Sequence, residues 1–539
     1  MSVAERVDRP MSAVADVLRI PLRHAQTIRA TQSGDSIMSI LHTTESEIAW
    51  PRSRALSAAL TLAIASSAAA APTQHPGLQM HSRTHGTASM ANGQRWPFAR
   101  DHALASHRPT PSGATLVVGN CNDDGPGSLR GTIATAASGD TVDASGLACG
   151  TISLTTGAIA IVVDDLTLIG PGPAALQVAN GAKYGRVFRH QGTGTLDLLG
   201  LTISGGVVSP AASESGTDGG CIFSNGNVNL GNAFDPANAA QGAVVRDCTA
   251  VSTAAGVPAR GGGVFAANGV SLASSLVTGC SAVAQDAATV SSGGGVFASG
   301  AVFSMKYSEV RESRASGPSG IGGGIAAAFM DTVSVSHSTI AGNEASARAG
   351  GAYLGTHNGE EVVIDNSTIS GNVSTAGEGG LIVNVQSGSI VGAIRLFSNT
   401  ITANRSDAAG ALAGALLGGP VELQGTIVSA NLSGGVPRDL KIDVGATGAD
   451  NLVGAAIGTP PPNGLVISDD PRLAPLANGG GPTRTHALRP DSPALDAGNN
   501  AIGSDTDQRG AGFSRTLGAR ADIGAFERDP DVIFRSGFE

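Results

Sequence analysis

The feature that most constrains the fold is a repeat of about 30 residues between Gly219 and Asn431. Each copy holds a β-branched residue followed three positions later by a small residue or Asn, and successive copies are 27 to 33 residues apart. These small or amide residues are Cys248, Cys280, Ser313, Asn343, Asn372, Asn404 and Asn431. A short repeat at a nearly fixed period is typical of a solenoid, in which each unit buries its apolar face against its neighbours.

Apolar residues within the copies stand in pairs separated by one position, such as Val333 with Val335 and Val362 with Ile364. This spacing places both side chains of a pair on one face of a strand. Glycine pairs or triplets open the copies, where the backbone must bend sharply. The sequence therefore predicts an all-β fold, a parallel β-helix. The Asn343, Asn372 and Asn404 positions predict a structural ladder of amides that bond from coil to coil.

Composition and charge agree with this fold and exclude one class of partner. The chain has 76 Gly among 539 residues and only 3% aromatic residues, which suits thin stacked coils. Its formal net charge is −10, and Lys and Arg do not cluster. A nucleic-acid-binding surface needs clustered cations to neutralise phosphates, so we expect no nucleic-acid partner.

The N-terminal 71 residues resemble a leader with a signal peptide. Arg52 and Arg54 precede an apolar run, Ala55 to Ile64, and small residues follow up to Ala71. The run is too short to span a membrane, so we expect no transmembrane helix in the mature chain. Export follows from this pattern, to the medium or the cell surface, whereas a short Ala-rich helix in a cytosolic protein is the alternative.

The remaining chain divides by composition and rhythm. Met38 would give the signal peptide a more ordinary start, so residues 1–37 are a segment that the cell need not translate. The predicted divisions are a His-containing linker at 72–114, an N-terminal cap with irregular first coils at 115–218, regular repeats at 219–431, a loop-rich C-terminal cap module at 432–527 and a tail at 528–539. Ser128 is the expected N-cap of a capping helix over Leu129–Ala137.

Five cysteines in an exported chain indicate disulfides and one unpaired thiol. Cys121 and Cys149 bracket a compact stretch and are the expected pair. Cys248 and Cys280 occupy equivalent places on successive coils, so they either bond to each other or stack as free thiols. Pairing of Cys221 with Cys248 is a third arrangement.

Two sets of motifs resemble known families. Asn122–Arg130 and Gly139–Val142 resemble the N-terminal motif of bacterial secreted right-handed β-helix proteins. The C-terminal module is similar to that of the choice-of-anchor Q family, and the coils are similar to the repeats of polymorphic outer-membrane proteins. The segments of the C-terminal resemblance are Pro475–Leu488, Ser492–Gly498, Asp507–Gly510 and Ala521–Glu527. These resemblances imply a right-handed, pectin-lyase-like β-helix that is exported to the cell surface or beyond, and they supply no catalytic residues.

Carboxylates are the groups to examine for catalysis, because glycosidic hydrolysis needs two or three of them at one face. The best candidates are Asp331, Glu360, Glu361 and Asp365, of which Asp331 and Glu360 fall at equivalent places on adjacent coils. They flank the apolar pairs at bends, where solvated acids are common, and the motifs of polygalacturonases and pectate lyases do not occur. We therefore expect no catalytic residues. His337 is interpreted as a structural residue in a polar stack.

The acids of the terminal module are the only ones that suggest a metal. Asp496, Asp505, Asp507 and Asp522 offer the hard oxygen ligands that calcium prefers. No EF-hand or nonapeptide loop accompanies them, and Asx-turns explain such residues equally well. Calcium is thus the one cofactor considered, and the expectation is that the protein holds none.

These observations favour a secreted or surface-associated, monomeric and non-enzymatic β-helix. Its expected role is adhesive, through binding to an extracellular polysaccharide or to a surface or matrix component. A polysaccharide lyase or glycoside hydrolase on the same scaffold is the first alternative, and a structural spacer is the second. The ligand, the anchor and the route of export are not encoded in any motif of the chain.

Overall fold

The computed structural model describes residues 113–530, apart from 183–184, 210–216, 233–234, 358–359, 386–391, 459–460 and 462–464. All described residues belong to one compact unit that spans Ala63–Glu539. The leader, most of the predicted linker and the end of the tail lie outside the described residues. Among the described residues, no helix has the length and apolarity needed to cross a bilayer.

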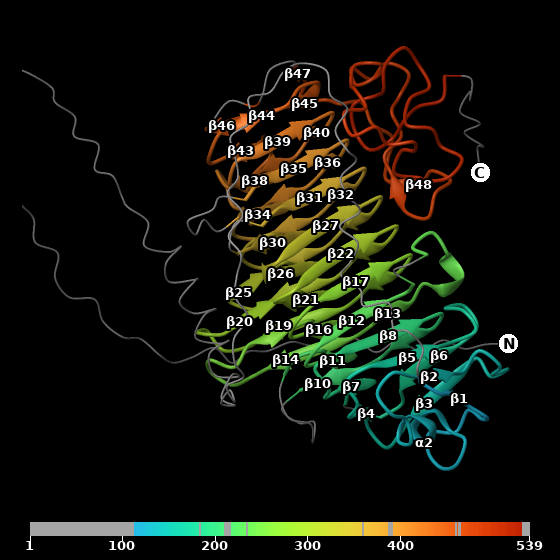
Figure 1. Ribbon diagram of the computed structural model, residues 1–539. Coiled ribbons are helices and arrows are strands. Elements are labelled where there is room, and N and C mark those ends of the chain that lie inside the picture. Colours follow the sequence, from blue (N-terminus) through green and yellow to red (C-terminus); the bar gives the residue numbers. More distant parts are fainter. Residues whose placement is uncertain are drawn as a thin grey trace, which may run out of the picture. The chain divides into compact units, whose positions relative to one another are not determined.

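The chain winds into stacked coils whose strands form four sheets, named here A to D, in which all pairs are parallel except the last pair of sheet D, β41 (Leu432–Ser433) with β42 (Figure 1). Sheet A has twelve strands, from β1 (Thr115–Val117) to β44 (Ala446–Thr447), and sheet B has twelve, from β3 (Thr151–Leu154) to β47 (Leu465–Ile467). Sheet C has eleven, from β4 (Ile159–Ile161) to β46 (Ala456–Gly458), and sheet D has nine, from β10 (Val207–Val208) to β42 (Val436–Pro437). The predicted all-β parallel β-helix is therefore confirmed.

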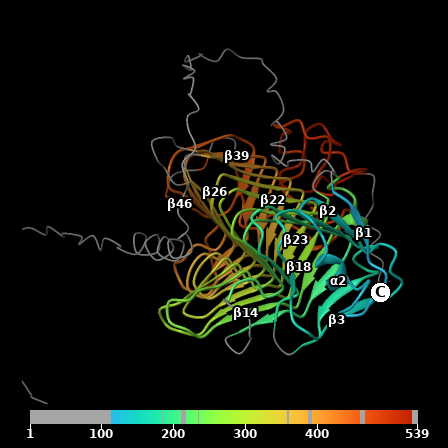
Figure 2. The same cartoon turned by 60° about the horizontal axis from the view of Figure 1, so that its bottom comes forward.

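One coil illustrates the path of the chain through the sheets. It runs through β26 of sheet C (Ile325–Met330), β27 of sheet A (Thr332–Ser336), β28 of sheet B (Thr339–Ala341) and β29 of sheet D (Glu344–Ala345), and then re-enters sheet C as β30 (Ala352–Thr356). Three short strands, β15 (Ala259–Arg260), β20 (Val290–Ser292) and β25 (Ser319–Ile321), add a small sheet between D and C in the middle coils. Viewed from its N-terminal side in Figure 2, the stack shows the sheets as the walls of the coil.

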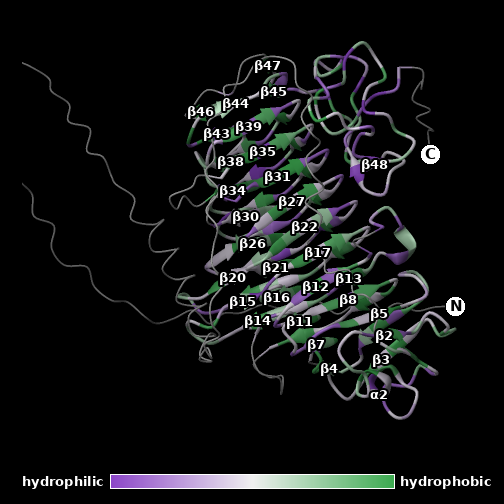
Figure 3. Cartoon of the chain, in the orientation of Figure 1, coloured by the Kyte–Doolittle hydropathy of each residue, from purple (hydrophilic) through white to green (hydrophobic). Residues whose placement is uncertain are grey.

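Inward-facing side chains fill the coils. Val333 and Val335 of β27 pair with Val362 and Ile364 of β31 (Val362–Asp365), and all four are fully buried. Such apolar residues join into one core cluster that runs from Val118 to Val453. Figure 3 shows the hydrophobic colour concentrated on the strands. The predicted apolar pairs are therefore the inward positions of sheet A.

Asn side chains close the corner between sheets B and D. The backbone N–H of Asn343 donates to Oδ1 of Asn372, that of Asn372 to Asn404 and that of Asn404 to Asn431, each over 3.0 Å. Each amide thus satisfies the backbone of the preceding coil. At Asn431 the N–H and Nδ2 both donate to Oδ1 of Asp439 over 2.8 Å. Asp439 is the last member of the ladder, and burial raises the pKa of its carboxyl group.

A second ladder, which was not predicted from the sequence, closes the corner between sheets A and B. The N–H of Ser308 donates to Oγ of Ser338, that of Ser338 to Ser367, and that of Ser367 to Oδ1 of Asn399. Its members are Ser275, Ser308, Ser338, Ser367, Asn399, Thr426 and Asn451. The residue before each has a positive φ of 42 to 57°, including the non-glycine residues Tyr307 and His337. These left-handed residues turn the chain from one sheet into the next.

The two ends of the β-helix differ from the predictions. The N-terminal helix α2 is Leu129–Ile133, shorter than the predicted span to Ala137, and Oγ of Ser128 accepts the N–H of Gly131 as its cap. The sheets continue past Asn431 to β47, so the boundary predicted at residue 432 is wrong. The coil after Asn431 is shorter than the others, and this change of period hid it in the sequence.

The C-terminal module, which in the structure comprises residues 468–530, packs on the outer face of sheet B. It is therefore not the end cap that the sequence predicted. Gln508 is fully buried there: its Nε2 donates to Ser338 O (3.2 Å) and Thr339 Oγ1 (2.9 Å), and its Oε1 accepts from Thr368 Oγ1 (2.6 Å). Further along sheet B, module residues join two outward-facing side chains in a small apolar cluster. This cluster comprises Ile427 and Leu452 of the sheet with Leu488, Ala494 and Ile523 of the module.

Two disulfides link the described cysteines. Cys121 bonds Cys149, the pair named from the sequence, and joins the segment before α2 to the stretch before β3. Of the alternatives left open, the structure contains the bond between Cys221 and Cys248. Cys280 is a buried free thiol, and burial raises its pKa to about 12.

The amide ladder predicts a specific loss of stability. Asn372→Leu keeps the branched shape of the side chain but removes buried hydrogen bonds to Asn343, Asn404 and Ile340 O. We expect a loss of at least about 3 kcal/mol in the free energy of unfolding, because several buried polar groups lose their partners. Denaturant unfolding measures it, with exposed Thr375→Ala as the control. Equal stability of the two variants would contradict the role of the ladder.

The docking of the module predicts a local effect. Gln508→Leu leaves the side chains of Thr339 and Thr368 without their amide partner, so the module should open from sheet B more often. Limited proteolysis should cut residues 468–530 at least several-fold faster than in the unaltered protein, while the coils resist. Arg489→Gln, an exposed change in the same module, is the control. Cleavage at the same rate in both variants would refute this function of Gln508.

Candidate functional site

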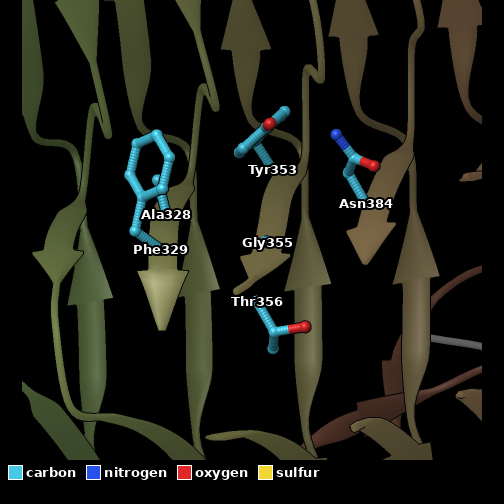
Figure 4. Close-up of a pocket in the computed structure, with 6 residues that line it drawn as sticks. All are labelled: Ala328, Phe329, Tyr353, Gly355, Thr356 and Asn384. Carbon is cyan, nitrogen blue, oxygen red and sulfur yellow. The ribbon is translucent and has the colours of Figure 1, made fainter. Parts of the chain in front are cut away.

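The outer face of sheet C carries a hollow near its corner with sheet A. Three neighbouring strands form it: β26, β30 and β34 (Leu381–Val385). The hollow has a volume of about 190 Å³, including solvent at its open mouth. Figure 4 shows its lining side chains side by side on these strands. They are Ala328, Phe329, Tyr353, Gly355, Thr356 and Asn384.

A β-bulge brings Phe329 to this surface. The pairing of β26 with β30 shifts between Ala327 and Met330, and Phe329 has a φ of 58°. A positive φ is unusual for a bulky residue, and bulges re-aim side chains. Met330 then takes the inward position and is fully buried, whereas Phe329 is partly exposed beside the hollow.

Gly355 forms the floor between the aromatic ring and the amide. A Cβ at this position would lie 3.4 Å from Cε1 of Tyr353 and 3.6 Å from the main-chain carbonyl oxygen of Asn384, so any side chain here would extend into the hollow. Tyr353 and Asn384 face outward on the adjacent strands β30 and β34. In this pair of strands Tyr353 lies opposite Ile382, and Gly355 lies opposite Asn384. Within the described part of the chain, neither the Tyr353 hydroxyl nor the Asn384 amide has a hydrogen-bond partner, so both are available to a ligand.

Asp331 and Glu360, two of the predicted acids, lie beside the hollow. Pairing of Val333 with Val362 places them at the same position of successive coils. Asp331 Oδ1 lies 3.3 Å from His357 Nε2, and its side chain is 61% exposed. His357 Nδ1 donates to the Met330 carbonyl over 3.1 Å.

Glu361 lies on the outer face of sheet A, next along the chain. Its Oε1 is 3.1 Å from Nη2 of Arg395, and Nε of the same guanidinium is 3.5 Å from Oε2 of Glu422. All three side chains are roughly 40% exposed. This row of charges crosses the strands at the spacing of the coils, about 4.8 Å.

Asp365 is separate from the other three acids. It ends β31, the strand that Glu361 precedes, so it lies at the opposite corner of sheet A. Its Oδ1 accepts from Ser336 Oγ (2.9 Å) and from Asn366 Nδ2 (3.2 Å), and burial raises its pKa. His337 Nδ1 lies 2.7 Å from the same Ser336 Oγ, and burial lowers the pKa of His337 to about 4. The four predicted acids therefore do not converge on one centre.

The acids considered for calcium also have protein partners. Asp507 is fully buried and pairs with Arg509 (2.6 Å), and Asp522 accepts the backbone N–H groups of Asp496 and Arg528. Asp505 accepts the backbone N–H of Arg515 through its carbonyl. Across the described residues, no group of three His, Cys, Asp or Glu side chains is arranged to hold a metal ion. The predicted set Asp496, Asp505, Asp507 and Asp522 is thus not brought together.

A second aromatic feature of sheet C has no free ring faces. Phe223, Phe265 and Phe297 stack along the coils with ring centroids 5.2 and 5.4 Å apart. The Arg260 guanidinium lies 4.8 Å from the Phe265 centroid and 5.2 Å from that of Phe297. The rings contact each other and a cation, so this stack stabilises the coils and offers a ligand little surface. Phe329 and Tyr353, in contrast, are partly exposed on the outer face of sheet C.

None of Phe329, Tyr353, Gly355 and Asn384 was predicted from the sequence as a site residue. The bulge that exposes Phe329 depends on the register of two strands, which the repeat pattern does not contain. The only sequence signal is Phe329 itself, a large apolar residue between Ala328 and Met330 where the apolar alternation breaks.

Comparison with known proteins gives a limited result. No protein-family model matches the chain, and no curated protein matches it. A solved structure titled "Crystal structure of pectate lyase Pel9A" is similar, with a TM-score of 0.42 and 14% sequence identity over 78% of this chain and 98% of that one. The assignment of the fold rests on the strand pairing described above.

The buried His337 predicts a pH dependence of stability. Its pKa is lowered to about 4, so between pH 6.5 and 4 the unfolded chain binds a proton that the folded chain does not, and stability falls as the pH falls. His337→Asn should remove up to about 3 kcal/mol of this loss. Asn fits the backbone, because Asn366 holds the equivalent place with a φ of 42°.

Unfolding free energies of both proteins at pH 7.5 and pH 4.5 test this expectation. Burial raises the pKa of Glu527 to about 7, which changes stability in the opposite direction, but this effect is common to both proteins and cancels in the comparison. Identical losses in the two proteins between these pH values would show that His337 is not responsible.

Proposed function

We propose that this protein binds an extracellular polysaccharide without cleaving it, and that the hollow on sheet C holds one sugar of the polymer. One observation carries the proposal: Phe329, Tyr353 and Asn384 converge over Gly355 on a solvent-facing sheet. Export and a place at or beyond the cell surface are part of the proposal, and they rest on the leader pattern and the motif resemblances of the sequence.

The chemistry of the hollow matches that of a sugar ring. A sugar has apolar C–H faces and a hydroxyl rim, so it pairs with aromatic rings and with neutral hydrogen-bonding groups. Phe329 and Tyr353 supply the rings, and the Tyr353 hydroxyl and Asn384 amide supply donors and acceptors. The hollow opens to solvent. One sugar ring of the polymer would therefore lie against its lining residues, with the neighbouring rings on the surface outside.

The surroundings of the hollow favour binding over cleavage. Hydrolysis needs two carboxylates facing the same bond, one of them protonated. Asp331 is engaged by His357 and Glu361 by Arg395, and Asp365 lies at the other corner of sheet A. The alternative of a lyase or hydrolase therefore has Asp331 and Glu360 as its best remaining pair, and the same experiment tests it.

The test uses the exported chain, residues 72–539, and a panel of neutral and acidic polysaccharides. Bound protein, new reducing ends and unsaturated products are measured on each polymer. Retention without products supports the proposal. Product formation that Asp331→Asn or Glu360→Gln abolishes would identify an enzyme instead. No retention on any polymer would leave the spacer or a protein partner as the function.

Variants of the hollow should weaken retention at least tenfold, about 1.4 kcal/mol. Tyr353→Ala removes one ring and its hydroxyl, and Gly355→Val fills the floor while keeping a residue that suits a strand. Affinity electrophoresis in gels containing the retained polymer measures the change. Leu416→Ala is the matched control, because Leu416 faces outward in the same row of sheet C two strands away from Tyr353.

Both pocket variants should unfold at nearly the same temperature as the unaltered protein, since the altered atoms face solvent and not the core. Full retention by Tyr353→Ala and Gly355→Val would exclude the hollow as the binding site. Equal weakening by Leu416→Ala would show that the effect is not specific to it.

A further inference from the structure

We propose that this site selects uncharged polysaccharides and excludes polyanionic ones. This inference rests on the proposed function and specifies the class of polymer. It follows from the contrast between a neutral hollow and an acidic rim, and each part of that contrast comes from described side chains.

The hollow itself carries no charge. None of its six lining residues is acidic or basic, so a carboxylated or sulfated sugar would find no cation to pair with inside it. Arg348 precedes Tyr353 by five residues. Its guanidinium is engaged by Glu378, with Nε 2.7 Å from Oε2 and Nη2 2.9 Å from Oε1. This bidentate pair is neutral as a unit and directs its donors to its own carboxylate.

The rim beside the hollow is acidic. Asp331 follows Phe329 by two positions, and Glu360 and Glu361 follow the loop after Thr356. With Glu422, four carboxylates stand against one guanidinium, that of Arg395, and the side chain of His357. The rim therefore keeps a negative formal charge even with His357 protonated. Its carboxylates are exposed, 61% for Asp331 and 39% for Glu361, so they act on a ligand in solution.

The rim should repel a polymer that carries a negative charge on each sugar. A chain whose one sugar fills the hollow must pass its neighbouring sugars over this rim, at separations within a Debye length of about 8 to 10 Å. Repulsion between exposed charges is screened by salt, so the discrimination should be strong at low ionic strength and weak at high ionic strength. Hydrogen bonds and ring contacts in the hollow do not depend on salt in this way.

Matched polymer pairs test the inference. Each pair shares a backbone: hydroxyethyl and carboxymethyl cellulose, dextran and carboxymethyl dextran, and methyl-esterified and de-esterified polygalacturonan. In 20 mM salt we expect at least tenfold weaker retention of the charged member of any pair that is bound. In 0.5 M salt the difference should fall to within about threefold. Tighter binding of the charged member at low salt would overturn the inference.

A double variant locates the effect. Asp331→Asn with Glu361→Gln removes two rim carboxylates, each from an ion pair, and should raise retention of the charged polymer at least fivefold in 20 mM salt. Retention of the neutral polymer should change by less than twofold. The matched control is Glu344→Gln with Asp407→Asn, which removes two carboxylates paired with Arg314 and Arg405 on sheet D. An equal gain in both doubles would assign the effect to net charge and overturn the role of the rim.

The outcomes separate this inference from the proposed function. Polymers that are retained through Tyr353 but without preference for the neutral member would refute the selectivity alone. No retention of any member of any pair would refute the proposed function, and the selectivity with it.

Discussion

The regular coils of this protein, from Ser275 onward, depend on hydrogen bonds between corner side chains and the backbone of the adjacent coil. A strand pairs its N–H groups with the strands beside it, but a corner leaves a buried N–H without such a partner. An unpaired buried N–H would cost a desolvation penalty. At the B–D corner, Oδ1 of Asn372 accepts the N–H of Asn343, and Asn404 accepts that of Asn372. Because each bond joins equivalent positions, the ladders also hold the coils in register, and the sheets follow from that register.

The ladders explain which parts of the fold the sequence predicts. The B–D ladder is visible because four of its members are Asn at steps of 29, 32 and 27 residues, and the inward apolar residues repeat with it. The A–B ladder is hidden because Ser, Thr and Asn alternate along it, although each supplies the same acceptor. The last coils are hidden because Asp439, only eight residues after Asn431, takes over the role of the next amide. A search for repeated residue types therefore misses positions at which different residues supply the same hydrogen-bond acceptor.

The position of the C-terminal module could not be predicted for a related reason. A solenoid needs a cover for its ends, so a loop-rich segment after the repeats suggests an end cap. Sheet B, however, presents Thr339 and Thr368 outward on successive coils, and both are buried. These hydroxyls are bonded by Gln508, a residue within the motif that resembles the choice-of-anchor Q module. Gln508 therefore contributes a contact of the module with the β-helix, and Asp507 and Arg509 on either side of it form a buried ion pair.

The candidate site obeys different constraints from the fold. Inward positions and corner ladders carry the stability of the coils, so the outward positions of sheets A and C can vary without disturbing them. Asp331 and Glu360 were predictable as neighbours, since they keep the repeat spacing, but the contacts of Asp331 with His357 and of Glu361 with Arg395 depend on side-chain geometry. The hollow needs a further departure from the repeat, the bulge at Phe329, which costs backbone strain of order 1–3 kcal/mol. A repeat that is otherwise regular tolerates such a departure only where the surrounding coils hold it in place, and this one occurs in the middle of the stack, with paired strands on both sides.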